Sequence, residues 1–297
     1  MILLKHAYLI ISHQDFDILE CIVKLIDDKR NDIFIHIDKK VTDFDKDKFK
    51  LLANKSNIFF VKNYDVKWGE YSLIQAEMSL FKESYLNDDY RYFHLISGSD
   101  MILKNQNYIH DFFEKYDGYE FISCATDEYT KNMSVINRFN RFHHIHKQEK
   151  MIKKFILKVL NILNFNRYRN DFKVSFGGNW VSITNEFVEY IIDNEKWIKK
   201  NFKYSHTCDE VYKQCLAINS KFRTKLFENK ENICNDLEKD NFISFNLRYI
   251  DWSEGASHPK IFTLEDYDKL INSNCIFARK FNTEIDIDII EKICIGI

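Results

Sequence analysis

Two adjacent cations near the end of the chain stand where they could hold an anion. The segment FARKF (277–281) sets Arg279 beside Lys280 inside an apolar run. An arginine fork and a lysine point charge together could form an anion clamp. The segment could also be a surface strand whose long cationic side chains reach out to water. The local residues leave both interpretations open.

Two adjacent carboxylates, Asp209 and Glu210, form a second group of residues that could take part in catalysis. The segment SHTCDEVYKQCLAIN (205–219) predicts a helix that has both carboxylates in its first turn. Thr207-x-x-Glu210 also matches a capping box, in which Glu210 would bond to the backbone rather than do chemistry.

A glycine pair precedes an amide and an indole in VSFGGNWVSIT (174–184). Gly177 and Gly178 allow a close backbone approach or a positive φ angle, as a simple turn would also require. Asn179 and Trp180 directly after them are typical of a carbohydrate platform, where a ring stacks on a sugar face and an amide reads hydroxyl groups.

Alternating apolar strands and amphipathic helices must position these groups. Strands are predicted at 6–12, 32–38, 57–61 and 92–97, with helices at 16–27 and 71–86. This order predicts an α/β fold with a mostly parallel, doubly wound sheet and helices on both faces. Ligands bind outside the carboxyl ends of such strands. The polar residues predicted there are Ser12, His13, Gln14, Asp38, Lys39, Lys40, Ser97, Gly98, Ser99 and Asp100.

The middle of the chain is strongly basic. Residues 131–173 hold eleven Lys or Arg and two acids. Within them, MIKKFILKVLNIL (151–163) predicts a helix with one apolar stripe and lysines mostly off that stripe. Such a helix can lie on an anionic membrane surface, or it can pack on a protein core and present its basic face to solvent.

The composition limits which classes of protein the chain can belong to. Forty-three cations nearly balance 45 anions, so the whole chain has no bias toward nucleic acid. Seven cysteines without a CxxC pair indicate reduced thiols rather than a disulfide framework or a zinc site. No stretch approaches the roughly 18 apolar residues of a membrane-spanning helix. We expect a soluble or peripheral protein with a single domain over residues 1–297.

Several segments, in this order, resemble the core-2/I-branching β-1,6-N-acetylglucosaminyltransferases and peptide O-xylosyltransferases, especially their bacterial relatives. They are AYLIISHQ, FIHIDKK, VKWGEYSLIQAEM, FHLISGSDMILK, GGNWVSIT, FVEYI, CDE, RYIDWSEG-x-x-HPK and FARKF. The likeness runs from about residue 6 to residue 282 and is weakest over 125–172. It implies a GT-A-type fold and an inverting transfer from a UDP-sugar.

The resemblance also assigns a role to the cation pair. Most GT-A enzymes hold a divalent cation with an Asp-x-Asp motif after a strand, but Ser99-Asp100 follows YFHLIS here. The likeness therefore implies metal-independent transfer without a cofactor, in which Arg279 and Lys280 bind the diphosphate. Where the mammalian branching enzymes carry another diphosphate-binding arginine, this chain has Ser257, and Lys260 nearby is the candidate substitute.

The likeness further implies that Glu210 is the catalytic base and that Asp38 lies near the uridine. An inverting displacement needs one carboxylate to take the proton from the acceptor hydroxyl. Supporting contacts to the nucleotide are expected from His13, Trp68, Gly69 and Asp100. Contacts to the acceptor or the donor sugar are expected from Gly178, Asn179, Trp180 and Asp209.

The expected function is transfer of a sugar, N-acetylglucosamine first, from UDP to a bacterial surface glycan or its lipid-linked precursor. One alternative is a UDP-xylose-type transferase. Another is a non-catalytic protein whose basic region 131–173 binds membranes or acidic partners. The expected location is the cytoplasm, with possible contact to the inner face of the cell membrane, and no nucleic-acid partner is expected.

Overall fold

A five-stranded sheet forms the centre of the computed structural model, which describes residues 5–125, 130, 151–162, 172–227, 246–252 and 258–297. The strand order is β3-β2-β1-β4-β6, and every neighbouring pair is parallel except β4 with β6. The strands are β1 (Lys5–Ser12), β2 (Asn31–Ile37), β3 (Asn57–Phe60), β4 (Tyr90–Ser97) and β6 (Ser182–Thr184). In register, Ile10 of β1 lies between Ile35 and Ile96.

Side chains of β1 alternate between two apolar cores, as the period of two in a strand requires. Tyr8 and Ile10 belong to one core, and Ala7, Leu9 and Ile11 belong to the other. Because both faces are covered, the central strands are nearly continuous apolar runs.

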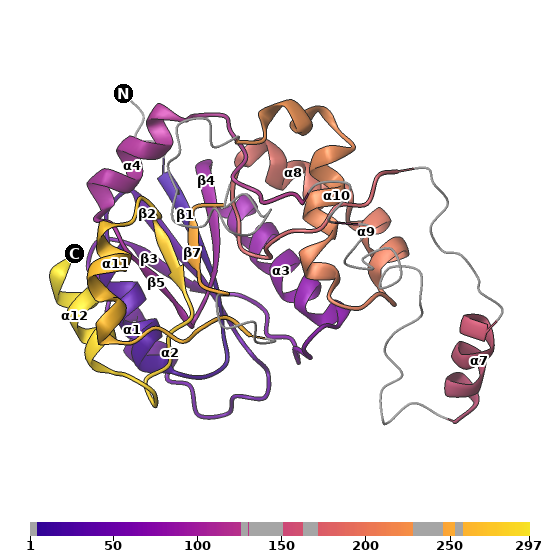
Figure 1. Ribbon diagram of the computed structural model, residues 1–297, viewed down its shortest axis with the longest axis horizontal. Coiled ribbons are helices and arrows are strands. Elements are labelled where there is room, and N and C mark those ends of the chain that lie inside the picture. The colour runs from indigo at the N-terminus through magenta and orange to yellow at the C-terminus, as the bar shows by residue number, and fades with distance from the viewer. Residues whose placement is uncertain (1–4, 126–129, 131–150, 163–171, 228–245, 253–257) are drawn as a thin grey trace.

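Helices pack on both faces (Figure 1). Helices α1 (Phe16–Ile26), α4 (Gln106–Lys115) and α12 (Asp288–Gly296) contribute to the core with Tyr8. Helices α3 (Tyr71–Asn87), α8 (Asn185–Asp193), α9 (Glu195–Phe202) and α10 (Tyr212–Ile218) contribute to the core with Leu9. The predicted α/β class, with a mostly parallel sheet and helices on both faces, is confirmed. A single domain over residues 1–297 stays a prediction.

A second sheet was absent from the prediction. It has three strands in the order β5-β8-β7, namely β5 (Asp100–Ile102), β8 (Phe277–Arg279) and β7 (Arg248–Ile250). Because β8 is the central strand and Phe277 and Ala278 are buried, the surface-strand interpretation of FARKF is wrong. Register places Arg279 opposite Asp100.

Shorter elements complete the described chain. They are α2 (Lys46–Lys50), α7 (Met151–Ile162), α11 (Tyr267–Asn272), and the 3-10 turns η1 (Cys208–Glu210), η2 (Lys221–Lys225) and η4 (Leu264–Asp266). Helix α7 confirms the helix predicted at 151–163, while most of the basic region 131–173 lies outside the described residues. Within the described chain, no helix combines the length and apolar character needed to cross a bilayer.

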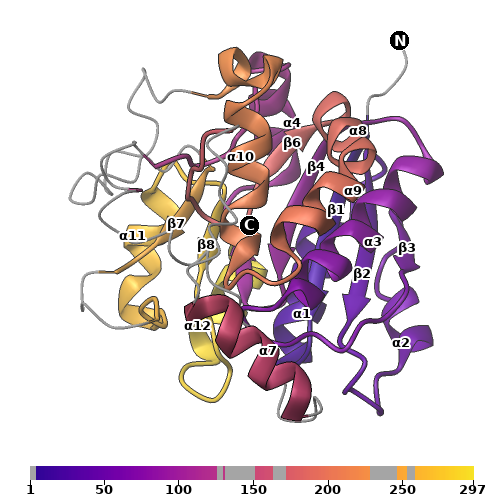
Figure 2. The same cartoon turned by 90° about the vertical axis from the view of Figure 1, so that its right-hand side faces the viewer.

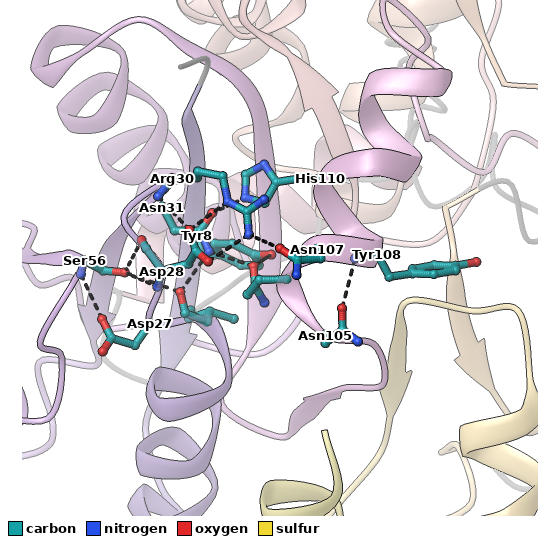
Figure 3. A network of polar contacts seen from close by, with 12 residues as sticks. Tyr8, Asp27, Asp28, Arg30, Asn31, Ser56, Asn105, Asn107, Tyr108 and His110 are labelled. Carbon is teal, nitrogen blue, oxygen red and sulfur yellow. Dashed lines mark hydrogen bonds and ion pairs between the residues drawn. The ribbon is translucent and has the colours of Figure 1, made fainter. Parts of the chain in front are cut away.

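A buried polar chain crosses the core between the two sheets, and we call it the histidine network. Arg248 donates to Ser182 Oγ at 3.0 Å, Ser182 Oγ contacts His94 Nδ1 at 2.9 Å, and His94 Nε2 contacts His6 Nδ1 at 3.1 Å. His6 stacks on His110 with 4.1 Å between ring centroids. Figure 3 shows its outer end, where His110 contacts Asn31 and Arg30 contacts Asp28 and Asn107.

Candidate active site

The end of β4 and the start of β5 together hold the guanidinium of Arg279, the last residue of β8. Its Nη1 donates to Asp100 Oδ1 at 2.7 Å and to Ser97 Oγ. Asp100 is fully buried, and its other oxygen accepts from the Ser97 backbone N–H at 2.8 Å. The guanidinium carbon lies 5.1 Å from the centre of the Trp180 ring. Asp100 therefore orients Arg279, which was expected to bind the diphosphate, and has no exposed surface with which to contact a nucleotide itself.

Lys280 differs from Arg279 in having no counterion of its own. Within the described chain its ammonium forms no hydrogen bond or ion pair, and the side chain is partly buried. Burial lowers the pKa of Lys280, and the positive charge of Arg279 lowers it further. A partly dehydrated cation without a carboxylate is the kind of group that an anionic ligand would neutralise.

The ammonium of Lys260 is already paired, because Asp266 Oδ1 lies 2.8 Å from its Nζ. The same carboxylate closes a capping box with Thr263. Lys260 lies near the clamp, since Phe262 N donates to the Lys280 carbonyl at 2.9 Å. A diphosphate at Lys260 would have to compete with Asp266, and its role as a substitute cation stays a prediction.

His13 and Asp38 follow neighbouring strands at the same edge of the main sheet. Asp38 is buried and accepts from the backbone N–H groups of Lys40 at 2.8 Å and Val66 at 3.2 Å. The pKa of His13 is lowered by partial loss of water, with Lys280 also lowering it while Asp38 acts in the opposite direction. Asp38 and the clamp cations thus lie within electrostatic reach of the same imidazole.

The carboxylate pair lies in a turn that the helix prediction misplaced. Asp209 and Glu210 belong to the 3-10 turn η1, and α10 begins after them at Tyr212. Thr207 has φ 48° and no capping hydrogen bond from its side chain, which donates instead to the His206 carbonyl at 2.8 Å. The capping-box interpretation of Thr207 and Glu210 is therefore wrong. Glu210 is partly exposed, as a group that meets substrate must be.

The glycine pair packs directly against this turn. Gly177 N donates to the Glu210 carbonyl at 2.9 Å, and a Cβ on Gly177 would lie 1.8 Å from the Ser123 carbonyl oxygen. Gly178 accepts from Gln214 Nε2 at 2.9 Å. Only glycine fits at residue 177, because the backbone approach leaves no room for a side chain.

A fully buried ion pair lies beneath the turn, and we call its surroundings the lysine cluster: Glu77, Asn179, Asp209, Tyr212 and Lys213. Lys213 Nζ is 2.7 Å from Glu77 Oε2 and 2.6 Å from Asn179 Oδ1. Tyr212 also donates to Glu77 Oε2, at 2.6 Å. Burial raises the pKa of Asp209 to about 6, with Glu77 adding to the increase and Lys213 opposing it.

Trp68 and Gly69 lie on the other side of the turn. Thr207 N donates to the Gly69 carbonyl at 2.9 Å, and the Trp68 and His206 rings meet edge-on at 5.3 Å. Gly69 has φ 71°, and a Cβ there would lie 2.5 Å from the His206 ring. Trp68 is 76% exposed, so its indole is open to a ligand.

The structure thus brings the predicted residues into two connected groups. Arg279, Lys280 and Asp100 form the clamp, and His13 lies within electrostatic reach of both the clamp and Asp38. Asp209 and Glu210 belong to the η1 turn, and Gly178, Trp68 and Gly69 lie around it. Trp180, stacked over Arg279, and Asn179, bound to Lys213, join the groups. Their roles in substrate binding stay predictions.

Sequence reasoning missed Ser97 as a ligand of Arg279, and it missed Glu77 and Lys213. The last two are fully buried. Both lie in helices where charged residues normally face solvent, so only the apolar positions beside them could have hinted at burial. The described residues contain no group of three His, Cys, Asp or Glu able to hold a metal ion. Metal independence itself stays a prediction.

Comparison with known proteins assigns the chain to a family. A model of the Core-2/I-Branching enzyme family matches residues 6–272. The chain belongs to this family. The expected class of enzyme, a glycosyltransferase of core-2/I-branching type, is confirmed at that level. The matched range includes Glu210, whereas the cations of the clamp at 279 and 280 follow it.

Individual relatives are distant. The chain is 25% identical over 291 residues to Xylosyltransferase sqv-6 of Caenorhabditis briggsae, a match that covers 87% of this chain and 32% of that protein. The chain therefore spans about a third of the length of this curated relative. Mouse Xyloside xylosyltransferase 1, in its apo form, matches with a TM-score of 0.39 and 6% identity over 92% of this chain and 96% of that one. This likeness is too remote to inform the site.

Proposed function

We propose that this Core-2/I-Branching domain transfers a sugar from a UDP-sugar to a hydroxyl of a bacterial surface glycan or its lipid-linked precursor, with inversion and without a metal. The supporting observation is that Asn179-Trp180 joins a partly buried cation pair to a partly exposed carboxylate turn. An inverting transfer needs these two groups on either side of one reacting carbon.

In the proposed reaction Glu210 takes the proton from the acceptor hydroxyl as its oxygen attacks the anomeric carbon. The bond from that carbon to the diphosphate oxygen breaks, and its electron pair leaves with UDP. Arg279 and Lys280 stabilise the charge that develops on the diphosphate, the work that a divalent cation does in other enzymes. Asp100 contributes by orienting Arg279 before substrate arrives.

N-Acetylglucosamine is the first candidate for the donor sugar, and xylose is the second because the C. briggsae relative is named a xylosyltransferase. A hydrolysis screen of UDP-sugars, with products identified by mass spectrometry, distinguishes them. We expect turnover to persist in EDTA and not to rise with manganese. Strict dependence on a divalent ion would refute the metal-free mechanism.

We also propose that α7 contacts an anionic membrane, which would place the enzyme at the inner face of the cell membrane, next to a lipid-linked acceptor. Phe155 is 69% exposed and Ile162 is 72% exposed, so these side chains of the apolar stripe are not packed on the protein core. Figure 1 shows α7 apart from the helices that cover the sheet, and Figure 2 looks onto the molecule from that side. Large exposed apolar side chains beside lysines suit an interfacial helix.

Vesicle sedimentation tests the membrane contact. Charge reversal at Lys153, Lys154 and Lys158 should release the protein from vesicles that contain anionic lipid, while UDP affinity stays unchanged. Each exposed cation near such a surface contributes about 1 kcal/mol. Absence of binding by the unmodified protein would end this part of the proposal.

A further inference from the structure

The ion pair between Lys213 and Glu77 joins two helices, but both charged groups must lose their hydration to form it. Both side chains are fully buried, with 2.7 Å between Nζ and Oε2. A buried ion pair usually stabilises a fold no more than apolar residues of the same volume would. Stability alone therefore does not account for a lysine at this position.

The geometry of the ammonium offers a different account, because it joins three segments at one point. Lys213 belongs to the first turn of α10, three residues beyond Glu210, and it bonds to Glu77 on α3 and to Asn179. Asn179 precedes Trp180, whose ring covers Arg279. One cation thus fixes the turn that carries the proposed base relative to the Asn179-Trp180 segment that covers the clamp.

Lys213 also decides which way the Asn179 amide faces. An ammonium only donates, so the atom 2.6 Å from Nζ must be the amide oxygen. The amide nitrogen then points elsewhere as a donor, and within the described chain it is buried without a partner. Glu77 Oε1 and Asp209 Oδ1 are likewise buried without partners among the described residues. Such atoms are costly to leave unpaired, so their position indicates that something other than fold stability selects this arrangement.

We propose that Lys213 is a positioning residue for glycosyl transfer. It fixes the Asn179-Trp180 segment that covers Arg279, and it holds the η1 turn so that Glu210 meets the acceptor. This inference rests on the proposed function, in which Glu210 is the base. Lys213 itself is too deeply buried to touch substrate.

The test removes both charges of the pair together. Lys213→Met alone would leave Glu77 buried without a counterion and would lower the melting temperature. The double variant Lys213→Met/Glu77→Gln removes both charges of the pair, so residue 77 no longer needs a counterion, and a glutamine can still accept from Tyr212. Asp209 loses the opposing effects of Glu77 and Lys213 on its pKa together. The matched control is Lys82→Met/Glu195→Gln, which removes a partly exposed pair of similar length, 2.8 Å, between the same helix α3 and α9.

We expect the double variant to melt closer to wild type than Lys213→Met does and to bind UDP normally by calorimetry, because the clamp is intact. Its kcat with UDP-N-acetylglucosamine or UDP-xylose, whichever the wild type uses, should fall at least 10-fold, while the control keeps wild-type kcat. Asn179→Ala should reduce kcat by a similar factor in the wild type and add little in the double variant, because Lys213 acts through that amide.

Normal kcat in a folded double variant would overturn the positioning role, as would a full additional loss from Asn179→Ala in it. Glu210→Gln, measured in parallel, separates this outcome from failure of the proposed function. An inactive Glu210→Gln with a fully active double variant refutes only the role of Lys213. A fully active Glu210→Gln removes the proposed base and with it the reason for positioning.

Discussion

The histidine network and the lysine cluster are both buried and polar, yet their hydrogen bonds are completed to different degrees. In the histidine network, among described atoms, Arg248 Nε alone is buried without a partner. In the lysine cluster, three members each keep one such atom: Glu77, Asn179 and Asp209. A completed network makes a core rigid and specific, whereas an incomplete one is destabilising unless another partner arrives. The difference indicates that the first network builds the fold and the second serves the site.

The two regions also respond to protons in opposite ways. Burial lowers the pKa of His110 to about 4 and holds those of His6 and His94 well below the usual range. Burial beside Glu77 raises the pKa of Asp209. In both regions the protein favours the uncharged form of a dehydrated group. Acid therefore disturbs the histidine network, and neutral pH disturbs the lysine cluster.

The largest expected effect concerns Glu210, in the η1 turn next to the lysine cluster. Glu210→Gln should reduce turnover by roughly 10²- to 10⁴-fold, because an amide cannot accept the proton from the acceptor at neutral pH. UDP affinity and melting temperature should stay nearly unchanged, since the Gly177 bond uses the backbone of Glu210. The test is to measure the transfer rate and the UDP affinity on the same preparation of Glu210→Gln. Near-normal turnover would shift suspicion to Asp209.

A second effect separates the clamp from the turn. Lys280→Ala should weaken UDP binding and slow transfer by roughly 10²-fold, the scale at which one preorganised charge-stabilising group acts. Calorimetry with UDP measures the affinity. The matched control is Lys292→Ala, which removes an exposed lysine of α12 that lies 4.0 Å from the centre of the Tyr267 ring. Equal UDP affinity in both variants would remove Lys280 from the anion site.

A third expectation concerns the histidine network and the stability of the fold. The pKa of His110 is lower in the folded state, so the unfolded chain binds more protons between about pH 4 and 6.5. The free energy of unfolding should therefore fall on acidification through this window, by up to about 1.4 kcal/mol per pH unit for each such histidine. The nearby charges are Arg30 and Arg91, which oppose protonation, and Asp28 and Asp111, which favour it.

Urea unfolding between pH 4.5 and 7.5 measures this slope. His110→Gln removes one titrating group and should flatten the curve below pH 6.5, whatever the variant does to stability at pH 7.5. An unchanged slope would show that His110 is not kept neutral by the fold.

The sequence predicted four of the five strands of the main sheet, because β1, β2 and β4 are apolar runs of seven or eight residues and the short β3 is apolar as well. The three-residue strand β6 was missed. The second sheet escaped because β7 and β8 are three residues each and pair across distant parts of the chain. Local patterning carries no information on such pairings. The segment FARKF was consistent with a surface strand for that reason.

The candidate site was predictable in its residues but not in its connections. Glu210 and the cation pair stand out by type and spacing. That Asp100 is buried under Arg279, or that Lys213 lies at the centre of a cluster, depends on contacts between segments more than 100 residues apart. The capping box failed for a similar reason, since the left-handed backbone of Thr207 is set by packing against Gly69.

The smallest expected effect concerns Asp209, through which the lysine cluster should lower the free energy of unfolding as pH rises, opposite to the effect of the histidine network. The pKa of Asp209 is raised to about 6 in the folded state, so the folded chain binds a proton more tightly than the unfolded chain does. Its contribution to stability is then present below the unfolded pKa of about 3.9 and is lost as pH rises through 6. Asp209→Asn, which stays uncharged, should gain roughly 1 kcal/mol relative to wild type between pH 4.5 and 7. This is below the full value of the shift, since Glu77 and Lys213 share the titration.

The measurement is the difference in free energy of unfolding between wild type and Asp209→Asn at each pH. Because both proteins contain the histidine network, its larger slope cancels in that difference, and only the lysine cluster remains. A difference that grows toward neutral pH means that the fold tolerates a charge beside Glu77 at a cost in stability, as expected for a group kept for its chemistry. A difference independent of pH would mean that Asp209 is ionised normally in the folded protein. The two networks would then differ in their hydrogen bonds alone.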